Sequence, residues 1–141
     1  MKAFFLALLA SLVWGLAPSF FKLVIKEGIP PSVILIFHNL SAFITAVLIT
    51  AILGESLWVN PKYLMFAFIG GFLSGFLGLY LFFLALRHGD VSIVSPVASI
   101  SPLWSAMFAY VFLGESLSWQ KVAGIVLIIA GVSLLSLSFQ K

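Results

Sequence analysis

The stretch GIPPSVILIFHNLSAFITAVLITAILG, residues 28–54, contains 27 consecutive residues without a charged side chain. A transmembrane helix needs about 20 mostly apolar residues to cross the hydrocarbon core of a bilayer. A strand of a membrane barrel would be shorter and would alternate apolar with polar residues, which this stretch does not do. The stretch therefore predicts a membrane-spanning helix.

Four more uncharged runs of similar length cover the rest of the chain. They hold 19 residues between Lys2 and Lys22, 24 between Lys62 and Arg87, 24 between Asp90 and Glu115, and 19 between Lys121 and Lys141. The runs predict five helical spans, at about 3–22, 33–53, 63–86, 91–113 and 120–139. The predicted fold class is an all-α membrane protein, with residues 1–141 forming one five-helix transmembrane domain.

The composition agrees with a chain whose main solvent is lipid. It is 63% hydrophobic and only 8% charged, whereas a soluble domain carries about 25% charged residues. The net charge of +3 fits loop lysines at lipid headgroups and not a nucleic-acid surface. The first run is also compatible with a signal peptide. We favour a packed helix, because the run exceeds the ~7–15 residues of a signal core and contains Trp14 and Pro18.

The phrase LGES occurs twice, at residues 53–56 and 113–116. Both copies follow the predicted end of a span, and five spans place these two loops on the same side of the membrane. Gly54 and Gly114 suit a left-handed residue that closes a helix C-terminus, and Ser56 and Ser118 are expected to cap the next helices. We interpret each copy of the phrase mainly as the boundary between a helix and a loop. The repeat suggests a duplicated helical hairpin followed by a fifth helix.

Small residues on the helix faces mark places where backbones can approach each other in lipid. The third span has Gly71, Gly75 and Gly78 on one face, and the fifth has Gly124 and Gly131 seven residues apart. These glycines predict close helix packing, within the chain or in a dimer.

The fourth span combines serines with prolines. Ser95 and Ser99 lie one helical turn apart, and Pro96 and Pro102 each remove a backbone donor. Freed carbonyls inside a membrane need protein or water, so this helix is expected to face a wet cavity. The alternative is a kinked packing helix whose serines bond to their own backbone. Pro18, Pro96 and Pro102 are the candidate hinges.

His38, in the second span, is the one histidine within a span, and charged side chains occur only at the ends of the first and fifth spans, as Lys22 and Lys121. Such groups usually face the interior of a bundle and mark pathways, and an imidazole can also exchange a proton near neutral pH. The alternative is a neutral histidine bonded to a carbonyl near the interface. The candidate residues of a substrate cavity are Trp14, His38, Asn39, Tyr80, Ser95 and Ser99.

Several kinds of chemistry have no residues to support them. No carboxylate lies within a span, the chain has no cysteine, and it has neither a histidine pair at metal spacing nor a phosphate-binding loop. We therefore expect no catalytic residues, no metal and no cofactor, and predict that the protein is not an enzyme. The missing carboxylate also argues against an antiporter that exchanges cationic drugs for protons.

Two stretches resemble a known family. ASLVWGLAPSFFK, residues 10–22, looks like the opening helix of the EamA-type domain of the drug/metabolite transporter superfamily. ALRHGDVSIVSPVASISPLWSAMFAYVFLGESLSWQKVAGIVLIIAGVSLL, residues 85–135, is similar to the last two helices of that domain, and Gly114, Glu115, Gly124 and Gly131 match its pattern. The second span departs from the pattern, because many members have an arginine where this chain has His38 and Asn39.

The resemblance implies a transporter that moves small metabolites or drug-like amphipathic solutes. Most members of the family carry two such domains, ten helices arranged as inverted repeats, and alternating access would come from rocking one five-helix unit against another. The alternative function is a non-transporting membrane subunit that assembles with or regulates a larger complex. The expected location is multi-pass in a prokaryotic inner membrane.

This chain has one such unit, so we expect a dimer. Positive charge selects the cytoplasmic side of a membrane protein. One side here holds three positive residues (Lys2, Lys62 and Lys121) and the other holds four (Lys22, Lys26, Arg87 and Lys141). A difference of one charge is nearly no bias, which predicts dual topology and an antiparallel homodimer. A parallel dimer and a pair with a second half-size chain are the alternatives.

Overall fold

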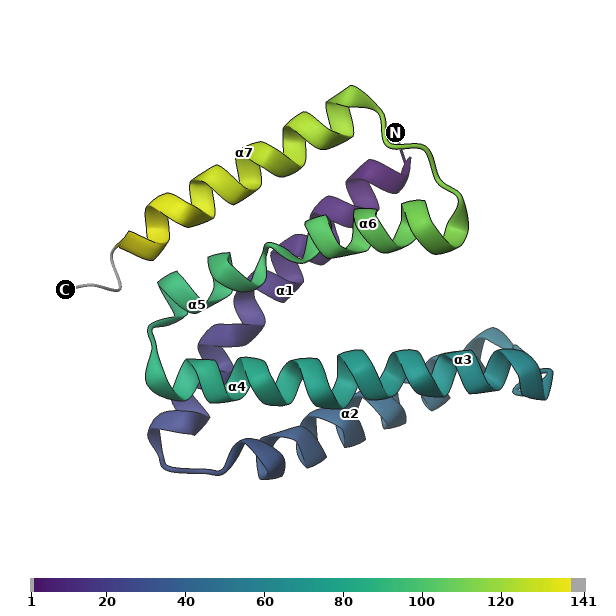
Figure 1. The fold of residues 1–141 in the computed structure, drawn as a ribbon. Coiled ribbons are helices and arrows are strands. Elements are labelled where there is room, and N and C mark those ends of the chain that lie inside the picture. Colours follow the sequence, from purple (N-terminus) through teal and green to yellow (C-terminus); the bar gives the residue numbers. More distant parts are fainter. Residues whose placement is uncertain (1, 138–141) are drawn as a thin grey trace. The chain divides into compact units, whose positions relative to one another are not determined.

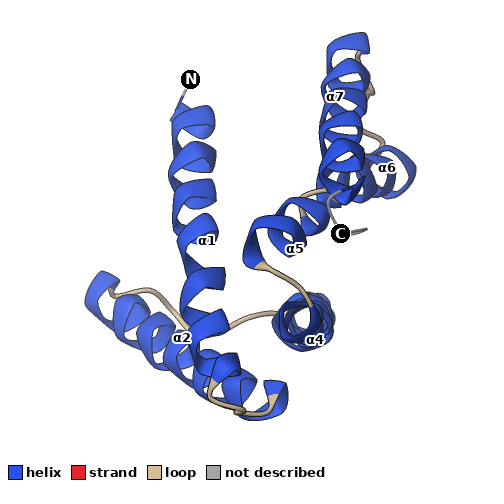
Figure 2. Ribbon diagram, turned by 90° about the vertical axis from the view of Figure 1, so that its left-hand side faces the viewer, coloured by secondary structure: helices blue, strands red, loops and turns tan. Residues whose placement is uncertain are grey.

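The computed structural model describes residues 2–137, and every regular element among them is a helix (Figures 1 and 2). In chain order the elements are α1 (Lys2–Lys26), α2 (Pro31–Leu53), α3 (Pro61–Gly71), the π-helix η1 (Phe72–Gly78), α4 (Leu79–His88), α5 (Val91–Ala98), α6 (Ser101–Leu113) and α7 (Trp119–Ser136). The predicted all-α fold class is confirmed.

Four of the helical segments are long and apolar enough to cross a membrane. They are Lys2–Lys26, Pro31–Leu53, Pro61–His88 and Val91–Leu113, and Trp119–Leu135 is a shorter apolar helix. Many large apolar side chains face outward, with Ile52 81% and Phe112 74% exposed. Exposing such surface to water is unfavourable by about 25 cal/mol per Å², whereas lipid accommodates it. The last residues of the predicted fifth span, after residue 137, lie outside the described part.

The chain divides into two compact units, whose boundaries fall at Pro18 and His88. Ser19–His88 forms one, here called the continuous unit, and Met1–Pro18 with Gly89–Lys141 forms the other, the terminal unit. Pro18 lies inside α1 and, as a proline, cannot donate to the carbonyl of Trp14 one turn earlier. The boundary between the units thus coincides with a missing backbone hydrogen bond.

The core of the continuous unit lies where α2 packs against α4 (Figure 1). Its buried side chains are Ile25, Ile34, Leu35, Phe83 and Leu86. A short turn with Gly28 in the left-handed region, at φ +79°, leads from α1 towards α2. Pro30 and Pro31 then begin α2, because a proline at the first helical position loses no hydrogen bond.

The segment between α3 and α4 is a π-helix, where the sequence predicted an uninterrupted α-helical span. Its residues are FLSGFLG, 72–78. A Cβ built on Gly78 would lie only 3.0 Å from the carbonyl oxygen of Leu73, five residues earlier. Glycine is therefore the residue that fits this wider turn without a backbone shift.

In the terminal unit α5 packs against α7, and Val94 and Val132 are buried. The predicted fourth span is broken at Ser99 and Ile100 into α5 and α6. Pro102 stands at the start of α6, where its missing N–H breaks the ladder of backbone bonds. Pro102, one of the candidate hinges, therefore stands beside the interruption of this span, whereas Pro96 lies inside α5.

The glycines of both LGES turns have the same backbone conformation. Gly54 and Gly114 are left-handed, at φ +66° and +67°, and each closes a helix. Ser118 caps α7 as expected, by accepting a hydrogen bond from the backbone N–H of Lys121 at 3.4 Å. The prediction for Ser56 is wrong: Asn60 caps α3 by accepting from the N–H of Lys62 at 3.0 Å. The longer loop after the first phrase delays the helix to Pro61.

Candidate functional site

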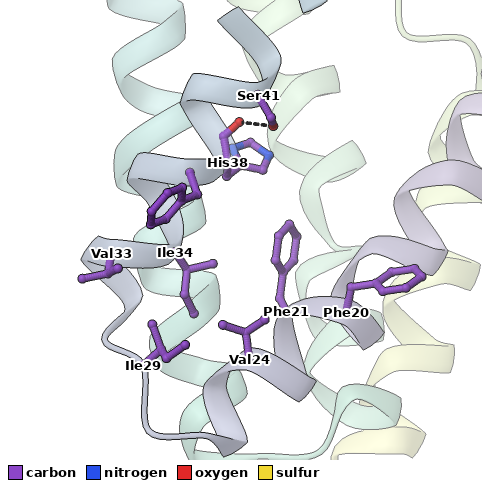
Figure 3. A pocket seen from close by; sticks show the side chains of 9 residues that line it. Phe20, Phe21, Val24, Ile29, Val33, Ile34, His38 and Ser41 are labelled. Carbon is purple, nitrogen blue, oxygen red and sulfur yellow. Dashed lines mark hydrogen bonds between the residues drawn. The ribbon is translucent and has the colours of Figure 1, made fainter. Parts of the chain in front are cut away.

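A cavity of about 520 Å³ lies in the continuous unit, on the faces that α1 and α2 turn towards each other (Figure 3). Its lining is apolar except for two residues and consists of Phe20, Phe21, Val24, Ile29, Val33, Ile34, Phe37, His38 and Ser41. Sites for small molecules usually measure about 300–1,000 Å³ and combine an apolar wall with a few polar groups. This cavity has the size and the lining of such a site.

The short connection between α1 and α2 positions the walls of the cavity. It reverses the direction of the chain between α1 and α2, so that Phe21 and His38 come together from separate helices (Figure 3). Their ring centroids are 5.7 Å apart at an interplanar angle of 64°. Phe21 also packs on Phe83 of α4, at 4.6 Å. The cavity wall is thereby continuous with the core of the unit.

His38 is the polar group that the cavity offers to a ligand. The hydroxyl of Ser41 donates to the backbone carbonyl of His38 at 2.8 Å, so its proton is already engaged (Figure 3). No charged side chain is part of the lining. A fully charged group inside the cavity would therefore lack a counter-charge, which is costly in a low-dielectric site.

Asn39 connects His38 to the π-helix. Its Nδ2 donates to the carbonyl oxygen of Gly75 at 3.1 Å, and its Oδ1 lies 3.4 Å from Nδ1 of His38. A Cβ on Gly75 would lie 3.4 Å from the same Oδ1, so this glycine gives the asparagine room. Asn39, which the sequence marked as a candidate cavity residue, is not part of the lining but links α2 to η1.

Lys22, the last residue of the predicted first span, reaches the end of α4. It lies inside α1, and its Nζ donates to the carbonyl oxygen of Leu86 at 2.5 Å. Leu86 belongs to the last turn of α4, where unpaired carbonyls favour a cation. The long aliphatic stem of lysine allows this reach from within the helix.

The other predicted cavity residues are not among those that line this cavity. Trp14 belongs to the terminal unit and is 75% exposed. Tyr80 stacks on Phe76 within the continuous unit, with centroids 5.8 Å apart. The Oγ of Ser95 is buried without a hydrogen-bond partner, whereas the hydroxyl of Ser99 donates back to the carbonyl of Ser95 at 2.9 Å. The two serines, predicted as one stripe, are thus in different surroundings.

The predicted packing glycines also differ from one another. Gly75 is close to Asn39, but a Cβ on Gly71, Gly124 or Gly131 would meet no described atom within 4 Å. Gly124 lines a second cavity of about 460 Å³ between α6 and α7, in the terminal unit. Lys121 and Glu115 also line it, with Nζ and Oε2 3.9 Å apart and both side chains about half exposed. Such an exposed ion pair contributes at most about 1 kcal/mol.

A metal site is not evident in the described part of the chain, where no three histidine, cysteine or carboxylate side chains come together. The residues that the sequence interpretation missed are the cavity phenylalanines, Phe20, Phe21 and Phe37. Their signal was present in the sequence. Two of them precede the short connection between the first two spans and the third follows it, so folding the hairpin brings them to one place.

The fold is that of a multi-pass membrane protein built from helices. The chain belongs to the EamA-like transporter family, whose sequence model matches residues 1–137. This family is part of the drug/metabolite transporter superfamily, so the resemblance seen in the sequence is confirmed. An uncharacterized protein of Methanocaldococcus jannaschii is 33% identical over 136 residues, which cover 96% of this chain and 97% of the relative. No solved structure matches significantly.

Proposed function

We propose that the protein transports a small amphipathic solute across the membrane and that the cavity beside His38 is where the solute binds. The observation that carries this proposal is the cavity itself, which measures about 520 Å³ and is apolar except for His38 and Ser41. Members of the family are transporters and not enzymes, and the hydroxyl of Ser41 in the lining donates to the backbone carbonyl of His38 and not to its ring. Binding and release, without a covalent step, is the chemistry that these residues support.

Transport by alternating access needs two units that rock against each other around the site. This chain supplies one five-helix unit, and the relative from Methanocaldococcus jannaschii is of similar length. We therefore propose a dimer as the working form. The near balance of positive charge between the two sides, three residues against four, supports an antiparallel arrangement, because orientation follows an excess of Lys and Arg. The proposed location is the inner membrane of a prokaryotic cell.

We place the proposed partner at the second cavity, between α6 and α7. It is lined by small residues, among them Ala106, Ala109 and Gly124, and has a volume of about 460 Å³. Small residues let helix backbones approach closely in lipid, and nothing described fills the space beside Gly124 or Gly131. A helix of a second copy of the chain could approach these small residues closely, which supports this surface as the dimer interface.

The transport proposal is tested with purified protein alone in vesicles. Ligand stabilisation rises with the ratio of concentration to dissociation constant, so a thermal-shift screen first selects the solute class that binds best. Counterflow of a labelled member of that class is then measured in vesicles with and without protein. Protein-dependent counterflow supports a transporter. Binding without counterflow by any selected solute contradicts it and favours a non-transporting membrane subunit.

The antiparallel dimer is tested separately, by adding a tag after Lys141 and probing its accessibility from each side of the membrane in cells. Dual insertion predicts two populations of similar size. If every tag lies on one side, the antiparallel homodimer is wrong, and a parallel dimer or a second chain of fixed orientation takes its place.

A further inference from the structure

The hydrogen bonds around His38 determine which ring nitrogen carries the proton. Asn39 uses its Nδ2 to donate to the carbonyl oxygen of Gly75 at 3.1 Å, so its other end, Oδ1, faces the histidine. An amide oxygen can only accept a hydrogen bond. In the neutral imidazole the proton must therefore be on Nδ1, the atom 3.4 Å from Oδ1. Nε2 is then left with a lone pair and acts as an acceptor.

The other lining residues restrict which chemical groups of a ligand can bind Nε2 of His38. The hydroxyl proton of Ser41 is engaged by the backbone, and no charged residue lines the cavity. Phe20, Phe21 and Phe37 supply aromatic faces and edges, which favour another ring. A carboxylate would meet the lone pair of Nε2 with no donor to neutralise it, so anions are disfavoured.

Resting on the proposed transport function, we infer that the cavity is a subsite for an uncharged aromatic group with one O–H or N–H donor. That donor binds Nε2 of His38, and the ring lies among the phenylalanines. Charged parts of the transported solute stay outside the lining, which does not enclose the cavity completely. Asn39 is a positioning residue, because it acts on the solute only through the tautomer of His38.

The test compares three probes in binding to the detergent-solubilised full chain at pH 8.5. Indole has a ring N–H donor, 1-methylindole has the same ring without it, and benzoate is an aromatic anion. A single hydrogen bond to a neutral acceptor predicts that indole binds about five- to tenfold more tightly than 1-methylindole. Benzoate is expected to bind most weakly. Equal binding of the two indoles, or tighter binding of benzoate, overturns the inference.

Three variants separate this effect from partitioning of the probes into detergent. His38→Phe removes the acceptor, so the preference for indole should disappear. Asn39→Leu removes the oxygen that fixes the proton of His38 on Nδ1. The ratio of the affinities for indole and 1-methylindole should therefore fall, while both probes still bind. His88→Phe is the matched control, because His88 ends α4 and does not line the cavity; it should keep the preference of the parent protein. A preference that survives in His38→Phe contradicts the inference.

The parent protein alone decides the comparison of the three probes, so a variant that fails to fold does not remove the test. The outcome is also distinct from that of the transport experiment. Donor-selective binding without counterflow of any solute supports the subsite and contradicts transport. Counterflow of solutes by a protein that does not distinguish indole from 1-methylindole contradicts the subsite and leaves transport standing.

Discussion

Asn39 and Gly75 join two helices through one side-chain hydrogen bond, from Nδ2 to the carbonyl oxygen at 3.1 Å. The acceptor belongs to the π-helical segment Phe72–Gly78, and the donor is the neighbour of His38 in the chain. π-Helical turns inside α-helices occur frequently at functional sites. Here the irregular segment and the cavity are connected through a single asparagine.

Replacing Asn39 by leucine should destabilise the protein by about 0.5–1.5 kcal/mol, since an interhelical hydrogen bond is lost at similar side-chain size. Ser74→Ala is the matched control. The hydroxyl of Ser74 donates only within its own segment, to the carbonyl of Gly70 at 2.8 Å, and a small change is expected. Thermal midpoints in detergent measure both. Equal changes in the two variants would show that the bond between Asn39 and Gly75 does not contribute.

Gly78→Ala should disturb the π-helical turn, because the new Cβ would lie 3.0 Å from the carbonyl oxygen of Leu73. Overpacking of this kind costs about 1–3 kcal/mol. Gly71→Ala is the control: its Cβ would meet no described atom within 4 Å, and alanine is the better helix former. Hydrogen exchange of the backbone amides of residues 72–78 reports the local effect. Unchanged exchange in Gly78→Ala would contradict the steric account of the π-helix.

The two LGES turns should respond alike to the loss of their glycine. Gly54 and Gly114 have φ values of +66° and +67°, and a left-handed conformation costs an L-residue about 1–2 kcal/mol. Gly54→Ala and Gly114→Ala are each expected to lower stability by that amount, as measured by denaturation in detergent. Gly15→Ala, inside α1 with open space around it, is the control. A loss at Gly15 as large as at Gly114 would be inconsistent with this explanation.

Cysteines at the two serines of the interrupted fourth span should differ in reactivity. Ser99 is exposed and lies at the break between α5 and α6, where free backbone groups need water or protein. The hydroxyl of Ser95 is buried. Ser99→Cys should react with a water-soluble thiol reagent in membranes, and Ser95→Cys should stay unlabelled. The reverse pattern would mean that water reaches the other side of this helix.

The overall fold could be predicted from sequence because a bilayer demands long uncharged segments. The runs between charged residues, such as the 27 residues that end at Gly54, indicate spanning helices without any knowledge of their packing. The left-handed glycines were also predictable, since few other residues adopt that conformation. Local chemistry therefore predicted elements and turns, with Ser56 as the exception, because Asn60 competes with it as a cap.

The site was predicted only in part, because it depends on which faces meet. His38 stood out as a rare polar group in an apolar run, and it does line the cavity. Phe21 approaches it through the fold of the α1–α2 hairpin, and the partner of Asn39 lies 36 residues away. The π-helix was not predictable either, since FLSGFLG is compatible with an α-helix and only the close approach at Gly78 distinguishes the two.

The most direct test of transport through the cavity is counterflow in vesicles by the parent protein, His38→Phe and His88→Phe. The labelled solute is the one that gives the largest thermal stabilisation. The account predicts protein-dependent counterflow that falls about tenfold in His38→Phe, because the loss of one hydrogen bond to the solute weakens binding by about this factor. Counterflow should be unchanged in His88→Phe, because His88 does not line the cavity and His38 does. Counterflow that is absent in the parent protein, or equal in all three, would contradict it.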